Sequence, residues 1–478
     1  MGRVMGALEP LRTAPLPAFP GWRVLIGPGI VWMALAQGSG ELIWWPYIIA
    51  KYGLTFLCLL VPACLLQYPL NYHIGAYTLL TGESIFQGFI RLHRGFAILL
   101  WVLMTVSFLW FGAFVTAGAT AMVALTGWPS GWSVQAQTHI WAYFGIGVCL
   151  VAILWSRVVY RAIERIMWVV AVVTVVGLLW SCLRPEVLAH WGAFASGICR
   201  PQWPPPRPFD PADATKLLTA VTFAGLGGFW TLFYSYWLRE KGIGMAGYAG
   251  KITGMRGDTA SSAAADAPVA AGLIPAASSD LAVQMRRWRS FLLVDSGVGI
   301  LGNLATTLMT CLLAYALLFP SGLYPQHYEI AVVQSRFFEV SWGATGRALF
   351  LVVAAAFLAD TWLATVDAVS RIHTDVVQSL FPETRRRSAR WWYYCFLGLL
   401  TVVTTVTMHW QEPGPLILTS AVIGFIGTVL FSGAVIVLVH RYLAVRLPVE
   451  ARLGRMAMLV TWIAYIGLAA VYLWVRFV

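Results

Sequence analysis

The sequence has few charged residues. Asp, Glu, Lys and Arg together make up 11% of its 478 positions, and hydrophobic residues make up 59%. Soluble domains carry about a quarter charged residues and are about half apolar. This shortage of charge excludes an ordinary water-soluble fold and favours a chain whose segments lie in a lipid bilayer.

The residue patterns of common hydrolytic and zinc sites are also missing. The seven cysteines and eight histidines form no cluster with zinc-ligand spacing, and there is no HExxH motif. Ser39, between Gly38 and Gly40, is a faint candidate for the nucleophile of an intramembrane hydrolase. Such a serine needs a histidine partner, and no histidine lies in the middle of a predicted span. We therefore expect no enzyme and no cofactor, with the hydrolase as a distant alternative.

Long apolar stretches dominate the rest of the chain. A helix crosses the bilayer with about twenty residues. Eleven stretches are long enough: 25–50, 54–80, 95–125, 137–156, 162–182, 216–238, 290–318, 346–375, 391–409, 415–440 and 456–475. They predict an all-α polytopic membrane protein with eleven transmembrane helices.

The distribution of basic residues predicts the orientation of these spans. The net charge is +12, and most Lys and Arg lie in segments on one side, for example Arg385, Arg386, Arg387 and Arg390. By the positive-inside rule this side is cytoplasmic. The N-terminus is then cytoplasmic and the C-terminus external, in a plasma (bacterial inner) membrane. The positive charge reflects topology, and we expect lipid but no nucleic acid as a partner.

The loops complete a domain plan. We expect a cytoplasmic tail over 1–24 rather than a cleavable signal peptide. We also expect an external loop over 183–215 that is too Pro-rich for regular structure, and a disordered cytoplasmic insertion over 242–289, rich in small residues. Spans 1–5 (25–182) and 6–10 (216–440) form two halves, followed by span 11 and the C-terminus (441–478).

Two spans contain glycine-rich interruptions. Span 1 reads "ALAQGSGELIWW" and span 6 reads "FAGLGGFW", with Gly225, Gly227 and Gly228. Five spans separate them, so span 1 runs outward and span 6 inward. Two inverted units that each open with a broken helix indicate a 5+5 inverted repeat, which is typical of secondary transporters. The alternative is that these glycines only allow close helix packing.

The interruption in span 1 carries the first candidate site residues: Gln37, Gly38, Ser39 and Glu41. The glycines expose backbone groups to a substrate, and Ser39 can cap the second half-helix. An ionisable residue at this depth, such as Glu41, marks a substrate or proton pathway. Alternatively, Glu41 only interacts with the dipole of the half-helix.

Several of these features together resemble the Nramp family. They are Gly27-Pro28-Gly29 before a broken first helix, "TGES" at Thr81–Ser84, the broken span 6 and the eleven spans. The resemblance implies a LeuT-like fold and proton-coupled transport of divalent metal ions.

The metal-binding positions depart from the family pattern. In the first break, Gly38 takes the place of a metal-binding Asp and Glu41 that of an Asn. In span 6, Gly227 replaces a Met whose sulfur contacts soft metals, and Trp230 replaces an Asn. Without the thioether, preference for a soft transition metal is not expected. Glu41 is then the candidate metal ligand that we expect to remain.

Span 8 carries the second candidate site. In the LeuT-like fold that the resemblance implies, span 8 packs beside the first break. Asp360 and Thr361 could there supply oxygen ligands for a coupling Na⁺ or a site for H⁺. Asp367 and Arg371, four residues apart, are expected to form a structural ion pair nearer the cytoplasm.

We therefore expect the substrate to be a small cation and the transporter to be a monomer. A hard divalent ion such as Mg²⁺ would use carboxylate and carbonyl oxygens with retained waters. A small organic cation or other small organic solute would instead use Glu41 and the ring of Trp230.

Overall fold

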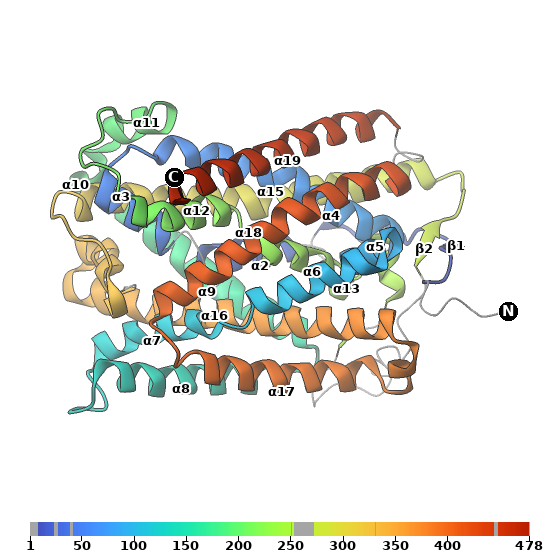
Figure 1. Ribbon diagram of the computed structural model, residues 1–478, viewed down its shortest axis with the longest axis horizontal. Helices are drawn as coiled ribbons and strands as arrows, with labels where there is room; N and C mark the ends of the chain where they lie inside the picture. Colours follow the sequence, from blue (N-terminus) through green and yellow to red (C-terminus); the bar gives the residue numbers. More distant parts are fainter. Residues whose placement is uncertain are drawn as a thin grey trace.

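Helices account for most of the computed structural model, which describes residues 8–22, 27–38, 42–249, 251–252, 272–329, 331–443 and 448–477. In the first half of the chain the helices are α2 (Pro28–Ala36), α3 (Trp44–Tyr52), α4 (Leu60–Thr81), α5 (Ile85–Leu92), α6 (Arg94–Ser107), α7 (Gly112–Thr126), α8 (Val134–Leu154), α9 (Val159–Cys182), α10 (Pro185–Leu188) and α11 (Trp191–Cys199). In the second half they are α12 (Ala214–Phe223), α13 (Phe233–Lys241), α15 (Leu281–Leu313), α16 (Arg336–Leu380), α17 (Ala389–Thr407), α18 (Pro413–Leu438) and α19 (Pro448–Phe477). The long helices run roughly side by side (Figure 1).

Nine helical segments within the described residues are long and apolar enough to cross a membrane. The predicted spans over 25–50 and 391–409 are not among them. The first is divided between α2 and α3, and the second corresponds to α17. The nine apolar segments make this an integral membrane protein, whereas the total of eleven spans stays a prediction.

Both predicted interruptions are present. In span 1, α2 ends at Ala36 and α3 begins at Trp44; residues 39–41 lie outside the described part of the chain. In span 6, α12 ends at Phe223, and Gly225, Leu226 and Gly227 all have positive φ before a short 3₁₀ helix, η4 (Gly228–Leu232). Glycine adopts this left-handed region without the steric cost that a Cβ adds, which explains the glycine-rich sequence.

The expectations for the two large loops are partly wrong. The segment 183–215 contains α10 and α11, and only its proline-rich part, 200–210, has no regular element. Within 242–289, the strand β2 (Leu273–Pro275) pairs in parallel with β1 (Arg12–Ala14) of the N-terminal tail, and α15 begins at Leu281. Residues 250 and 253–271 lie outside the description. Hydropathy does not detect the polar first turns of α15, and it cannot predict pairing between strands far apart in sequence.

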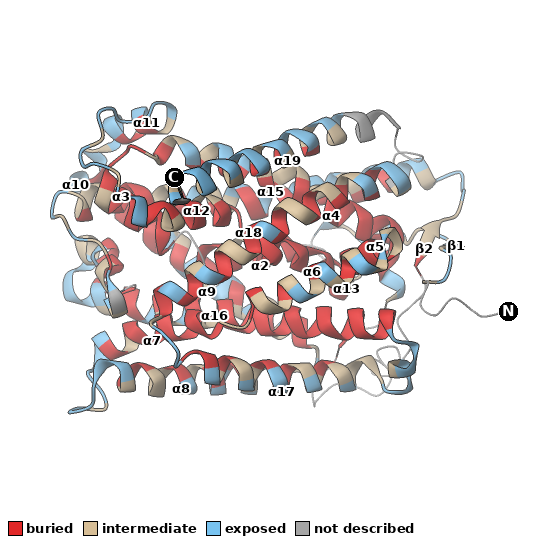
Figure 2. Cartoon of the chain, viewed as in Figure 1, coloured by how far each residue is buried: buried red, intermediate tan, exposed pale blue. Residues whose placement is uncertain are grey.

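Burial separates central from peripheral helices (Figure 2). Every residue of α16 from Asp360 to Leu380 is buried. Helices α8, α17 and α19 instead expose large apolar side chains such as Phe144, Val402 and Trp474. Apolar side chains exposed along whole helices are expected to face lipid. The polar and charged residues of α16 therefore lie inside the helix bundle, where they can form a site.

The backbone at the second break generates a stability prediction. Gly227 has a φ of 59°, and an added Cβ would overlap the carbonyl oxygen of Thr222. Gly127 has a φ of 60°, with no atom within 4 Å of an added Cβ. Alanine should cost about 1–2 kcal/mol at either position through left-handed strain. Only Gly227→Ala adds the overlap, so thermal unfolding in detergent should show a clearly larger loss than Gly127→Ala; equal losses would contradict this geometry.

Candidate functional site

Helix α16 brings the two breaks together. Gly38, at the first break, lies so close to Thr361 that an added Cβ would overlap the threonine hydroxyl. One turn further along α16, Thr365 Oγ1 accepts a hydrogen bond of 3.0 Å from the indole N–H of Trp230, at the second break. Residues four apart lie on one face of a helix. Thr361 and Thr365 therefore connect the two breaks through one face of α16.

Gln37 marks the end of α2 at the first break. Its side chain is buried, and neither amide atom has a hydrogen-bond partner among the described residues. Gln37 lines a cavity of about 20 Å³ together with Leu42, Thr174, Thr306, Thr310 and a set of apolar side chains. A cavity of this size can hold one water molecule. The first break therefore borders a small internal space on one side.

A larger cavity of about 390 Å³ adjoins residues 43–51. We call it the outer vestibule because it lies at the end of the bundle that is predicted to be external. It is lined by Ile43, Trp44, Tyr47, Lys51, Lys216, Tyr324, Pro325, Gln326, Glu412, Gly414, Pro415 and Leu418. Leu42 lines the small cavity and Ile43 lines the vestibule, so the first break lies between the two. Ser39 and Glu41 lie outside the described residues, and their roles stay predictions.

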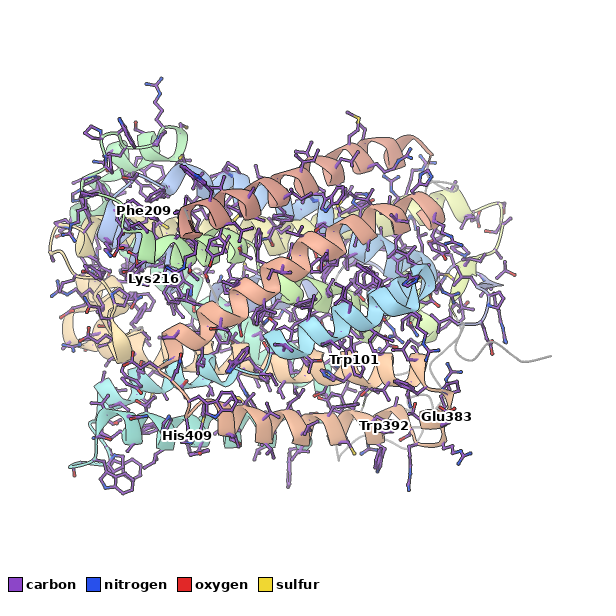
Figure 3. The ribbon with its side chains drawn as sticks, viewed as in Figure 1. Trp101, Phe209, Lys216, Glu383, Trp392 and His409 are labelled. Carbon is purple, nitrogen blue, oxygen red and sulfur yellow. The ribbon has the colours of Figure 1, made fainter. Side chains whose placement is uncertain are left out.

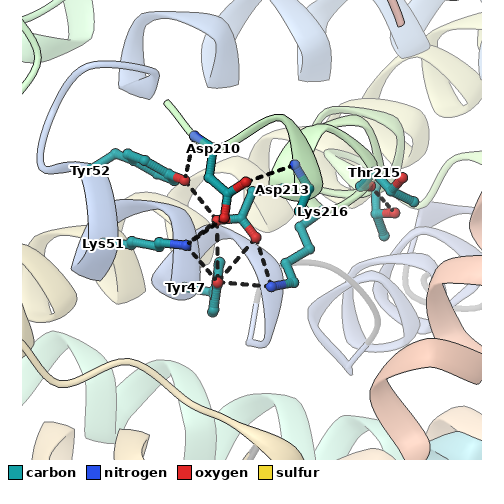
Figure 4. A network of polar contacts seen from close by, with 9 residues as sticks. Tyr47, Lys51, Tyr52, Asp210, Asp213, Thr215 and Lys216 are labelled. Atoms are coloured by element: carbon teal, nitrogen blue, oxygen red, sulfur yellow. Dashed lines mark hydrogen bonds and ion pairs between the residues drawn. The ribbon is translucent and has the colours of Figure 1, made fainter. Parts of the chain in front are cut away.

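One wall of the outer vestibule is held by Asp213 (Figure 4). This buried carboxylate accepts hydrogen bonds from the hydroxyls of Tyr47 (3.1 Å) and Tyr52 (2.7 Å) and from the ammonium groups of Lys51 (2.6 Å) and Lys216 (2.7 Å). Two positive donors and two hydroxyls compensate the loss of hydration of a buried carboxylate. The Asp213 cluster thus joins α3 to α12, the outer halves of both broken spans.

The two ends of the helix bundle are distinct. Lys216 and Phe209 lie at one end and Glu383 at the other (Figure 3). The Lys216 end holds the outer vestibule, and the Glu383 end is predicted to be cytoplasmic.

At the second break, a glutamine from α4 pairs with the exposed backbone. Gln67 accepts a hydrogen bond from the N–H of Gly227 (3.0 Å) and donates one to the carbonyl of Thr222 (2.8 Å). Backbone groups at membrane depth need partners inside the protein, because lipid supplies none. The sequence pattern does not single out Gln67, although a glutamine inside an apolar span is itself a signal of an interhelical hydrogen bond.

Trp230 is completely enclosed. Its ring makes edge-to-face contacts with Phe108, Phe223 and Phe114, at centroid distances of 4.6, 5.3 and 5.9 Å. Aromatic pairs prefer this arrangement. For Trp230 to hold an organic cation on its face, these rings would first have to move apart.

The side chains of Asp360 and Thr361 face different parts of the structure. Thr361 lies against Gly38, whereas Asp360 lines a separate cavity between α16, α7 and α8. The structure therefore does not bring Asp360 to the first break. A role for either residue toward a coupling ion stays a prediction.

The predicted cytoplasmic end is closed by ion pairs, called here the inner lattice. Lys241 pairs with Glu164 of α9 (2.7 Å), and Arg239 pairs with Asp375 of α16 (3.4 Å). Arg371 of α16 pairs both with Glu240 and, as expected, with Asp367 (2.9 Å). These pairs hold α13, the inner half of broken span 6, against α9 and α16.

Asp295 binds α2, the inner half of broken span 1, at the same closed end of the bundle. Its carboxylate accepts hydrogen bonds from the N–H of Gly29 (3.0 Å), in the first turn of α2, and from the hydroxyl of Tyr234 (2.8 Å) on α13. The free N–H groups at a helix start favour such a carboxylate.

The pairing of Gln67 with the second break yields a graded prediction. Gln67→Leu leaves the Gly227 N–H and the Thr222 carbonyl without partners, which costs about 1–3 kcal/mol for each buried group. Gln67→Glu keeps an acceptor for the N–H and should lose less. Unfolding in detergent should rank the proteins as wild type, then Gln67→Glu, then Gln67→Leu. A Gln67→Leu protein as stable as wild type would show that this pairing contributes little.

The fold has counterparts among solved structures. The chain is similar to the manganese transporter of Eremococcus coleocola in complex with an aromatic bis-isothiourea substituted compound, with a TM-score of 0.57, 12% identity and coverage of 99% of this chain and 98% of that chain. It is also similar to MhsT in complex with L-phenylalanine, with a TM-score of 0.52, 14% identity and coverage of 94% of this chain and 98% of that one. No protein-family model matches the sequence, and no curated protein matches it either. The chain shares the LeuT-like fold of these two structures.

Proposed function

We propose that the protein is a secondary active transporter, related to the Nramp family, that moves a small cation into the cell by alternating access. One observation carries the proposal: the outer vestibule reaches the first break while the inner lattice closes the opposite end. Transporters with broken helices alternate between such a state and one with the opposite end open.

The contacts indicate which parts move together. The Asp213 cluster joins the outer half-helices α3 and α12, so they would move as one unit. The inner half-helices α2 and α13 are both bound to Asp295 and would form a second unit. Opening the cytoplasmic end requires the pairs of Lys241, Arg239 and Arg371 to separate, which costs free energy because several of these charges are buried. Substrate or coupling-ion binding would offset this cost.

For the substrate, we favour a hard divalent ion such as Mg²⁺ over an organic cation. Three phenylalanine rings occupy the surroundings of Trp230, so its ring is not available in this conformation. Within the described residues no three His, Cys, Asp or Glu side chains group into a possible metal site. The ion would therefore rely on Glu41, backbone carbonyls and retained waters, as Mg²⁺ commonly does.

The coupling ion would be H⁺ or Na⁺. Thr361 is the described candidate for a ligand of a coupling Na⁺, since its hydroxyl lies against Gly38 at the first break.

The choice of metal is tested by uptake into proteoliposomes. Magnesium should accumulate, and manganese and cadmium should be poor substrates, because Gly227 and Gly38 provide neither a thioether nor a carboxylate. Robust, saturable manganese uptake at micromolar concentration would contradict this assignment. Transport of a quaternary amine in place of either metal would support the organic-cation alternative.

The role of Glu41 is tested by Glu41→Gln, which keeps the size and hydrogen bonding of the side chain but removes its charge. If Glu41 binds the cation, uptake should fall at least tenfold while the protein still folds. If Glu41 only interacts with the half-helix dipole, the variant should lose about 0.3–1 kcal/mol of stability and keep its transport. Glu383→Gln makes the same change at an exposed glutamate outside the vestibule and serves as the matched control. Near-normal uptake by a well-folded Glu41→Gln protein would refute the role.

A further inference from the structure

A third cavity is lined by none of the described residues of the two breaks. It has a volume of about 290 Å³ and lies between α7, α8 and α16, with Ile166 of α9 also lining it. We call it the lateral cavity. Phe144, Val148 and Val352 line it and are themselves 62%, 53% and 47% exposed. Exposed apolar side chains on membrane-spanning helices face lipid, so the lateral cavity opens toward the hydrocarbon region of the bilayer.

Asp360 is the acidic residue of this cavity. Its side chain is 2% exposed, and neither carboxyl oxygen has a hydrogen-bond partner among the described residues. The other titratable side chain among the described lining residues is Cys149, whose thiol donates to the carbonyl of Ala359 at 3.7 Å. The remaining lining residues are glycines or carry apolar side chains, together with the indole of Trp141.

This environment dictates the state of the carboxyl group. An isolated carboxylate in an apolar site is strongly destabilised, so the neutral acid is the favoured form until a cation is present. A buried ionisable group without a partner is also rare, because its removal from water costs free energy that no hydrogen bond or ion pair returns. The lateral cavity thus combines an apolar chamber, access from lipid and one carboxylic acid able to donate a proton.

We propose that the lateral cavity is a binding site for a lipophilic amine that enters from the membrane. The amine would cross the lipid as its uncharged free base. In the cavity its nitrogen would take the proton of Asp360: the O–H bond breaks, an N–H bond forms, and an ammonium–carboxylate pair results. No net charge enters the site, and the pair is favoured by the short distance in an apolar surrounding.

Other ligand classes fit the cavity less well. A metal ion would need several oxygen ligands, whereas one carboxyl group is available among the described lining residues. A quaternary ammonium ion cannot accept the proton of Asp360, so that proton would have to leave for water. A lipid tail would fill the chamber without using the acid. The volume suits an arylalkylamine of about ten non-hydrogen atoms, whose ring can pack against Trp141 and Phe144.

The proposal is independent of the transport function. Asp360 and Thr361 are adjacent, but Thr361 faces the first break and Asp360 faces the lateral cavity. Binding can therefore be measured at equilibrium, without a gradient or transport.

The test is equilibrium binding of tritiated N,N-dimethyl-2-phenylethylamine to the full-length protein in lipid nanodiscs. Wild type should bind it saturably. Asp360→Asn should weaken binding at least tenfold, because the amide cannot give up a proton. Ala356→Phe keeps the acid but should fill the cavity mouth and weaken binding similarly, which keeps the proposal testable if Asp360→Asn does not fold. Val402→Phe, at a lipid-facing position of α17, is the matched control and should bind like wild type.

Two comparison ligands separate the mechanisms. The trimethylammonium analogue should bind at least tenfold more weakly than the tertiary amine. Isobutylbenzene, which has no amine, should compete poorly. The proposal is overturned if Asp360→Asn folds and binds the amine like wild type, or if isobutylbenzene competes as well as the amine, since the cavity would then be a simple lipid-facing pocket.

Discussion

A break in a membrane helix is tolerated only if the backbone groups that it exposes find partners inside the protein, and the rest of this structure depends on that constraint. At the second break Gln67 bonds to both Gly227 and Thr222, which fixes α4 against α12 and η4. At the start of α2, Asp295 accepts from Gly29 and so fixes α15. Helix α16 then connects both breaks through Thr361 and Thr365.

The ends of the broken helices are held by different kinds of contact. At the outer end a single buried carboxylate, Asp213, gathers two lysines and two tyrosines beside the outer vestibule. At the inner end several ion pairs distributed over α9, α13 and α16 close the bundle. Separating buried charges from their partners is costly. In the proposed cycle the outer end is accessible in this conformation, and the inner end opens only when binding of the substrate or the coupling ion offsets that cost.

The features that depend on local sequence could be predicted. Both breaks follow from glycine-rich runs, and the Asp367–Arg371 pair follows from four-residue spacing on one helix. The resemblance to the Nramp family implies the LeuT-like fold, and the structural comparisons bear it out. By contrast, contacts between distant segments could not be predicted from local sequence. Gln67 and Gly227 are 160 residues apart, and the partners of Asp213 come from two spans. The separation of Asp360 from the first break depends on the rotation of α16, because consecutive helical residues point about 100° apart.

We infer that the two ends of the bundle open in alternation about the broken helices. Pulsed electron paramagnetic resonance on two spin-label pairs in nanodiscs tests it most directly. One pair crosses the outer vestibule, at the exposed positions Asp210 and Gln411, and the other crosses the inner lattice, at the exposed positions Arg161 and Tyr248. On adding the transported cation with its coupling ion, the inner distance should lengthen while the outer distance shortens. Lengthening of both distances together, or no change in either, would contradict alternating access.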